Sequence, residues 1–102
     1  MAHRVIWSPE AVEDLTEIRE YIARDSDTYA AAFVERVIAA VELLGDFSGM
    51  GHRVPEIDDD SIRELLVDRY RVIYRLRDDA IDIAAIIHGA RDLLPALRGR
   101  DL

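Results

Sequence analysis

The sequence predicts an α+β fold with the element order β-α-α-β-β-β, in which an N-terminal helical hairpin packs on one face of an antiparallel sheet. Two patterns predict this class. Apolar residues recur every three or four positions through residues 9–44, which is the period of amphipathic helices. From residue 62 the period becomes two, as in strands that bury one face. With 102 residues, the chain is expected to form a single domain over residues 1–102.

The first two elements are a short strand and a helix. Residues 3–7 are rich in β-branched and aromatic side chains and stop at a Ser-Pro pair, which predicts a strand. Ser8 is then a suitable N-cap and Pro9 a suitable first helical residue. The apolar stripe of this helix consists of Ala11, Leu15, Ile18 and Ile22.

A second helix follows the short connection at residues 24–27, with Ser26 or Asp27 as its N-cap. Because the connection is short, the two helices are expected to be antiparallel neighbours. Gly45 is expected to end the second helix in the left-handed conformation. Residues 46–61 are predicted to form one long loop. Three apolar side chains are expected to hold this loop against the core: Phe47, Met50 and Ile57.

Three strands are predicted at residues 62–67, 70–77 and 80–87, joined by two-residue turns. The register of the last pair follows from the requirement that the apolar faces share the core. The other face, which carries arginines, is predicted to be exposed, with a surface ion pair between Arg75 and Asp82. The predicted pairs are Leu76–Ile81, Tyr74–Ile83 and Val72–Ala85 on the core face, and Arg75–Asp82, Ile73–Ala84, Arg71–Ile86 and Arg69–His88 on the other.

The composition argues against several classes of function. There is no cysteine, so disulfides and thiolate chemistry are excluded. No segment has the length and hydropathy of a signal peptide or membrane span, so a soluble, cytoplasmic protein is expected. The net charge of −8 disfavours binding to free nucleic acid. All basic side chains are arginine, which indicates compositional bias more than selection of particular arginines.

The candidate site residues gather where the last two strands meet. The register predicts a rim made of Arg69, Arg71, His88 and Arg91, which could bind a phosphate or a carboxylate of a partner protein. His88 could act as a general acid or base, with Glu56 as its partner. A structural role for His88 at the strand end is favoured. We expect no cofactor and no metal, because the three histidines lack ligand spacing.

The order of elements resembles the RelE/ParE superfamily of bacterial type II toxins, in particular its ParE branch. The stretches that carry the resemblance are "SPEAVEDLTEIREYI", "GMGHRVPEI" and "YRVIYRLRDDAIDIAAIIHGARDL", and it covers residues 3–97. It implies a toxin that a cognate, ParD-like antitoxin neutralises in a hetero-oligomeric complex. It further implies DNA gyrase as the target of the released toxin.

RelE-type relatives instead cleave messenger RNA on the ribosome. By resemblance, Arg71 and Arg91 match the two arginines of that catalytic set. The two lysines of the set fall at Ile62 and Glu64, and its tyrosine falls at Leu97. Loss of these groups should cost several factors of about 10² to 10⁴. The resemblance therefore favours a toxin without catalytic residues over a nuclease.

Another nuclease branch uses a Glu, an Arg and a His followed by Tyr, which Glu56, Arg71 and His88 resemble. Here Gly89 and Ala90 follow the histidine, so the aromatic partner is absent. A nuclease that uses Arg71, Arg91, His88 and Glu56 remains the alternative hypothesis. A third hypothesis is a degenerate, non-toxic member that only binds its antitoxin. The antitoxin interface is expected around the following residues, where they are not internal: Val34, Val37, Val41, Tyr74 and Ile83.

Overall fold

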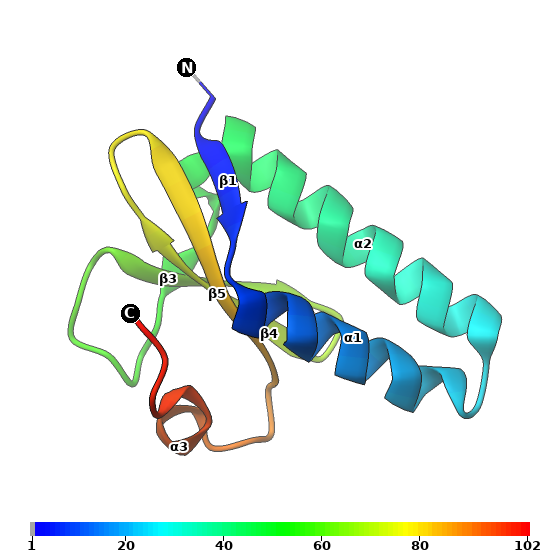
Figure 1. Ribbon diagram of the computed structural model, residues 1–102. Coiled ribbons are helices and arrows are strands. Elements are labelled where there is room, and N and C mark those ends of the chain that lie inside the picture. The colour runs from blue at the N-terminus through cyan, green and yellow to red at the C-terminus, as the bar shows by residue number, and fades with distance from the viewer. Residues whose placement is uncertain (1) are drawn as a thin grey trace.

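The computed structural model describes residues 2–102 as a five-stranded sheet with three α-helices, which confirms the predicted α+β class (Figure 1). The chain order matches the predicted order of strand, helical hairpin and strands. The elements are β1 (Arg4–Trp7), α1 (Pro9–Ala23), α2 (Asp27–Asp46), a 3-10 turn η1 (Ser48–Met50), β2 (His52–Arg53), β3 (Ile62–Val67), β4 (Tyr70–Leu76), β5 (Ala80–His88) and α3 (Leu93–Leu97).

Both helix starts lie where the sequence predicts them. The Ser8 hydroxyl accepts the Ala11 N–H at 3.0 Å and caps α1, and Ser26 caps α2 by accepting the Tyr29 N–H at 3.0 Å. The predicted helix end at Gly45 is wrong, because α2 continues to Asp46. At Gly45 the helix approaches β1 closely, and a Cβ there would lie 3.2 Å from the His3 carbonyl oxygen. Close packing therefore explains this glycine better than helix termination does.

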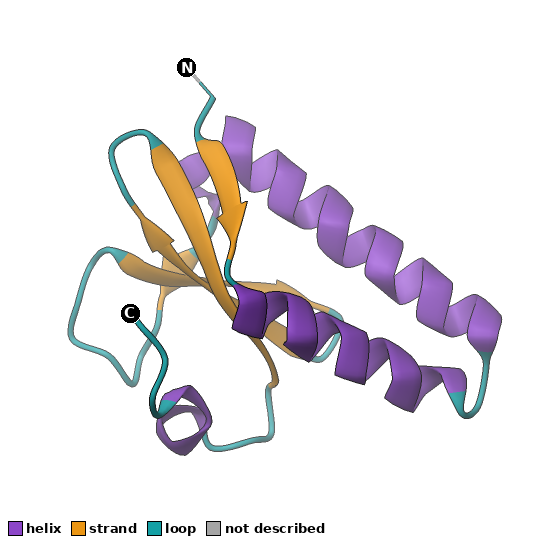
Figure 2. Ribbon diagram, in the orientation of Figure 1, coloured by secondary structure: helices purple, strands orange, loops and turns teal. Residues whose placement is uncertain are grey.

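The sheet has the strand order β1-β5-β4-β3-β2 and is antiparallel except at one edge. There β1 pairs with β5 in parallel over four residues, from Arg4 with Ala80 to Trp7 with Ile83. The opposite edge is the two-residue strand β2, so the prediction that residues 46–61 form only a loop is wrong. Figure 2 shows α1 and α2 side by side along the sheet, with α3 apart from them near the C-terminus. Within residues 2–102, no helix is long and apolar enough to cross a membrane.

The predicted register of β4 and β5 is right in its first half and wrong in its second. Leu76 pairs with Ile81 and Tyr74 with Ile83, as expected. A bulge follows, and Ile73 pairs with Ala85, so that Ala84 is the extra residue. Every later pair is shifted by one. The corrected pairs are Val72 with Ile86, Arg71 with Ile87, and Tyr70 with His88.

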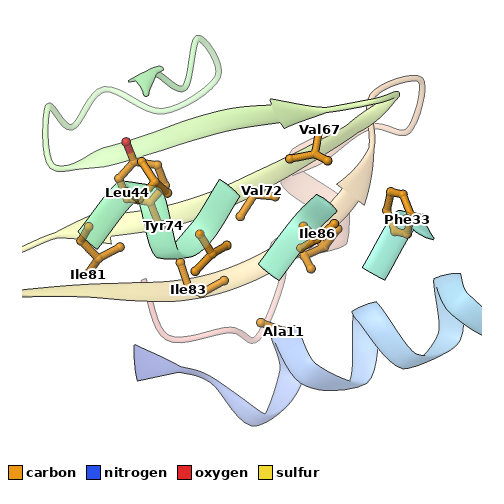
Figure 3. Close-up of a cluster of buried hydrophobic side chains, with 11 residues drawn as sticks. Ala11, Phe33, Leu44, Val67, Val72, Tyr74, Ile81, Ile83 and Ile86 are labelled. Carbon is orange, nitrogen blue, oxygen red and sulfur yellow. The ribbon is translucent and has the colours of Figure 1, made fainter. Parts of the chain in front are cut away.

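The helical hairpin covers one face of the sheet, which we call the hairpin face. The larger apolar cluster lies between them (Figure 3). Phe33 and Leu44 of α2 lie against side chains of β4 and β5, and Tyr74 is fully buried in this cluster. Val37, Val41, Tyr74 and Ile83 are internal and therefore drop out of the expected antitoxin interface, whereas Val34 is only partly buried. Each fully buried side chain of this size contributes about 1.5–3 kcal/mol.

The opposite face is also covered, which corrects the expectation that it is exposed. On this face, which we call the α3 face, α3 and the long loop bury a second apolar cluster. Pro95 lies in the first turn of α3, as the sequence allows. Met50 and Ile57 of the loop pack against the core as predicted. The same prediction for Phe47 is wrong, because its side chain is 62% exposed. The second cluster consists of Val54, Ile62, Ile73, Ala85, Ile87, Leu93 and Leu97.

Candidate functional site

The bulge in β5 divides the predicted rim between the two faces of the sheet. A strand alternates faces at each residue, so one extra residue turns all following side chains to the other side. His88 consequently shares the hairpin face with Tyr70, its partner across the strands, while Arg71 pairs with Ile87 on the α3 face. Arg69 lies in the turn before β4, and its carbonyl oxygen accepts the Gly89 N–H at 2.8 Å. The four residues lie at the same end of the sheet, but they do not form a single site.

Arg71 lies between two carboxylates, and we call Arg71, Glu56 and Glu64 the charge cluster. Its Nε and Nη2 donate to the two oxygens of Glu64 at 2.7 and 2.9 Å. Its Nη1 and Nη2 donate to the two oxygens of Glu56 at 2.7 and 2.8 Å. Two bidentate pairs thus use four of the five N–H donors of one guanidinium. The Arg71 and Glu64 side chains are 11% and 10% exposed, whereas that of Glu56 is 35% exposed.

The charge cluster carries a net charge of −1 when all three groups are ionised. The hydrogen bonds from Arg71 hold the pKa of Glu56 below its ordinary value, against the opposing effect of burial. Hydrogen bonds to Glu56 and then Glu64 raise the pKa of Arg71 further. Glu56 is thereby stabilised as a carboxylate that accepts from Arg71, which makes it a weaker proton acceptor. An added phosphate would have to compete with both carboxylates for Arg71.

His88 ends β5 and is exposed, with its ring edge-on to Tyr70 at a centroid distance of 5.2 Å. Its Nδ1 accepts the Ala90 N–H at 3.0 Å. The Arg91 N–H donates to the His88 carbonyl oxygen at 3.0 Å, which closes a turn over residues 88–91 that we call the His88 turn. This observation agrees with the structural role that the sequence favoured for His88.

Three surface hollows surround this end of the sheet. One, of about 330 Å³, lies between α1 and β5 and is lined by Tyr21, Tyr70, His88 and Arg91 among others. A second, of about 350 Å³, is lined by His88 and Arg69 on the side of α2. The third, of about 370 Å³, lies on the α3 face and is lined by Glu56, Arg71 and Arg91. Only Arg91 among the rim residues belongs to hollows on both faces.

Arg69 and Arg91 differ from Arg71 in having charges available for a partner. Over residues 2–102, neither of them lies within 4.0 Å of a carboxylate oxygen. Both are exposed. In the same part of the chain, no cluster of three or more His, Cys, Asp or Glu side chains is arranged to hold a metal ion. This end of the sheet therefore presents two exposed arginines and an exposed imidazole.

The one ion pair that the sequence predicts, between Arg75 and Asp82, does not form. Arg75 and Asp82 are opposite each other, but Asp82 pairs with Arg77 at 2.8 Å. Arg75 instead donates to the Ser61 hydroxyl at 3.0 Å. The sequence analysis considered Glu64 only as the position of a missing lysine and did not predict its contact with Arg71. The signal was present, because period two and the two-residue turn at 68–69 place Glu64 and Arg71 on one face of adjacent strands.

A clamp between α1 and the C-terminal tail was not predicted at all. Arg100 donates to both oxygens of Asp14, at 2.7 and 2.9 Å, and to the Ala84 carbonyl oxygen at 3.1 Å. Asp14 in turn accepts the Ile86 N–H at 3.0 Å. These side chains satisfy backbone groups of β5 beyond Trp7, where β1 has ended. No local pattern signals a contact between residues 86 positions apart.

Comparison with known proteins places this geometry in context. A family model described as the ParE toxin of the type II toxin-antitoxin system parDE matches residues 5–93. A relative named Toxin RelE2, from Caulobacter vibrioides, is 32% identical over 89 residues, which cover 86% of this chain and 97% of the relative.

Two solved structures share the fold. One is titled the chromosomal ParDE TA system from P. aeruginosa, with a TM-score of 0.70, 20% identity, and coverage of 85% of this chain and 96% of the other. The other is the YoeB dimer from Staphylococcus aureus, with a TM-score of 0.51, 16% identity, and coverage of 86% and 98%.

Proposed function

Because this chain belongs to the ParE toxin family of type II toxin-antitoxin systems, we propose that it inhibits DNA gyrase and that a co-expressed, ParD-like antitoxin neutralises it. The observation that carries the choice of target is the charge cluster. Arg71 occupies the position that the resemblance gives to a phosphate-binding arginine, yet Glu56 and Glu64 take four of its N–H groups. Such a group is poorly suited to stabilise charge on a scissile phosphate.

The separation of the other candidate residues supports the same proposal. A general acid or base has to lie within hydrogen-bond reach of the reacting atom, together with the groups that stabilise charge there. His88 lies on the hairpin face, and Arg71 and Glu56 lie on the α3 face. The net charge of −8 adds a penalty for docking among ribosomal RNA phosphates. A protein target such as gyrase carries no such penalty.

The rim is the surface that we assign to protein partners. Arg69, His88 and Arg91 are exposed, whereas Arg71 lies on the α3 face within the charge cluster, where Arg91 lines the same hollow. Arginines without a carboxylate partner can donate hydrogen bonds to acidic side chains of an antitoxin. The antitoxin is proposed to bind without a cofactor. Co-expression with a ParD-like antitoxin, followed by purification of one stable complex, tests this part of the proposal.

The decisive experiment is a gyrase supercoiling assay with purified, antitoxin-free toxin. We expect inhibition of supercoiling or accumulation of cleaved DNA, and we expect the antitoxin to reverse it. The matched variant Arg69→Ala with Arg91→Ala should retain the fold, because neither side chain makes an ion pair within residues 2–102, and should bind its partner less tightly. Unimpaired gyrase at a large molar excess of toxin would exclude the target.

The alternative is a ribosome-dependent endonuclease, and one observation favours it. Glu56 and Arg71 are in direct contact, as in a site that pairs an acidic and a basic group. Primer extension on translated messenger RNA would then reveal cuts that Glu56→Gln and Arg71→Lys abolish. The third hypothesis, a non-toxic member that only binds its antitoxin, predicts normal growth when the chain alone is induced. Separate measurements of DNA and protein synthesis after induction distinguish the three.

A further inference from the structure

The His88 turn contains one hydrogen bond whose acceptor can be protonated. Three backbone N–H groups hold this turn. Gly89 donates to the Arg69 carbonyl oxygen at 2.8 Å and Arg91 donates to the His88 carbonyl oxygen at 3.0 Å. Between them, Ala90 donates to the Nδ1 atom of the His88 ring at 3.0 Å. Carbonyl oxygens keep their lone pairs at any pH, whereas an imidazole nitrogen does not.

The hydrogen bond from Ala90 requires an Nδ1 atom that carries no proton. An imidazole nitrogen that accepts a hydrogen bond carries no proton, so the neutral ring has its proton on Nε2. A second proton can only be added at Nδ1. The Ala90 N–H would then face another N–H at the same distance and would lose its acceptor. Histidine is the side chain whose ordinary titration lies near physiological pH.

We infer that His88 is a pH-sensitive lock on the turn that carries Arg91: protonation of Nδ1 releases the Ala90 N–H, loosens residues 89–92 and changes the position of the Arg91 side chain. Arg91 lines hollows on both faces of the sheet. The residues of this turn are exposed, so few packing contacts hold it once the bond is lost. Regulation of partner binding by this lock rests on the proposed function, but the lock itself does not.

The groups that face His88 come from four directions. Asp14, Glu17 and Tyr21 of α1 and Arg91 line the hollow on one side. Tyr29 of α2, with Asp68 and Arg69 of the turn before β4, lines the hollow on the other side. Tyr70 of β4 packs against the ring.

Two of these acids are already neutralised. Asp14 pairs with Arg100 and Asp68 pairs with Arg36. Glu17 is the acid left to attract a protonated His88, while Arg69 and Arg91 repel it. Repulsion between His88 and Arg91 acts in the same direction as loss of the hydrogen bond, because both move the turn away from the ring.

The test is nuclear magnetic resonance of the full-length chain from about pH 8 to about pH 5, which spans the ordinary histidine titration. Ring nitrogen shifts report the protonation of His88, and amide exchange corrected for the intrinsic rate reports the Ala90 N–H. We expect protection of the Ala90 amide to fall roughly tenfold with the titration of His88, the factor that one hydrogen bond supports. If protection of the Ala90 amide does not change while His88 is protonated, the proposed lock is wrong.

Two variants make the test specific. In His88→Asn, the Oδ1 atom can accept the N–H of the residue two positions later, as in an Asx turn, and it does not titrate. Its turn should stay ordered across the pH range. In His88→Phe, the ring remains but the acceptor is gone, so Ala90 should be unprotected at every pH. A pH response in His88→Asn equal to that of the wild type would contradict the inference.

A second measurement separates the lock from the proposed function. The affinity of the purified antitoxin for wild type and for His88→Asn is compared at the two ends of the pH range. We expect acidification to weaken binding to the wild type more than binding to His88→Asn. If protection of the Ala90 amide falls as His88 is protonated, but the two affinities change equally, then the lock is supported and the assignment of the rim to the antitoxin is wrong.

Discussion

The two faces of the sheet are closed by different kinds of interaction. On the hairpin face, two long helices bury large apolar side chains such as Phe33 and Leu44. On the α3 face, a helix of five residues and a loop cover a smaller apolar cluster, and a buried arginine with two carboxylates lies at its border. Apolar packing tolerates small changes of geometry, but a buried charge requires its partners in place. The α3 face should therefore be the more sensitive to single charge changes.

The largest expected effect is on the α3 face. Arg71→Ala should lower the free energy of unfolding by about 3–5 kcal/mol, because it leaves the carboxylate of Glu64 buried without a partner. Urea denaturation near neutral pH measures the loss. The control is Arg75→Ala, whose side chain is 30% exposed and should cost less than about 1 kcal/mol. Similar losses for both variants would show that burial of the charge cluster has no energetic consequence.

A close approach at the edge of the hairpin face should have the next largest effect. A Cβ at Gly51 would overlap the Tyr74 hydroxyl and would lie 2.7 Å from the Glu64 carbonyl oxygen. We expect Gly51→Ala to cost about 1–3 kcal/mol through overpacking. Gly49→Ala is the matched control, because nothing lies within 4 Å of its added Cβ. Thermal unfolding should separate the two, and an unchanged midpoint for Gly51→Ala would refute the overlap.

The clamp of Arg100 on Asp14 connects α1, β5 and the C-terminal tail, and its loss should have a moderate effect. The two side chains are 18% and 14% exposed. Arg100→Ala should cost about 1–2 kcal/mol, because Asp14 loses two charged hydrogen bonds but keeps the Ile86 N–H. Amide exchange of residues 98–102 should also accelerate. Arg98→Ala, which removes an exposed side chain, serves as the control and should leave these rates unchanged.

The smallest expected effect is the pH dependence of the stability that the charge cluster contributes. The pKa of Glu56 is lower in the folded state than its ordinary value of 4.5, so the folded state binds fewer protons. Its contribution to stability is present above pH 4.5 and disappears as the pH falls through the lower, folded pKa. Since the Glu56 side chain is 35% exposed, solvent screening limits this contribution to about 1 kcal/mol or less.

The variant Glu56→Gln tests the direction of this pH dependence. Stability curves of wild type and variant should differ at neutral pH and converge in acid, because protonation makes the wild-type side chain neutral as well. Chemical denaturation at a series of pH values supplies the curves. A difference that grows as the pH falls would mean that Glu56 is not the group whose charge stabilises the fold.

Much of the fold could be predicted because the signals are local. Ser8 and Ser26 mark helix starts through side-chain bonds to N–H groups three residues ahead. The alternation in β4 and the two-residue turns predict the hairpins. The candidate site was predicted less well, because one bulge at Ala84 reverses the side of every later residue in β5. His88 and Arg71 were placed on one face for this reason.

The sequence by itself determined the class of fold, the helical hairpin, four of the five strands and the family, since these depend on period, caps and the order of motifs. Only the tertiary structure decided which charges are free. Arg71 and Arg91 are both arginines near strand ends, yet Arg71 is bound by Glu56 and Glu64, while Arg91 is exposed on the His88 turn. The physical reason is that a charge is neutralised by groups near it in space, and a distant loop and a strand bulge set those distances.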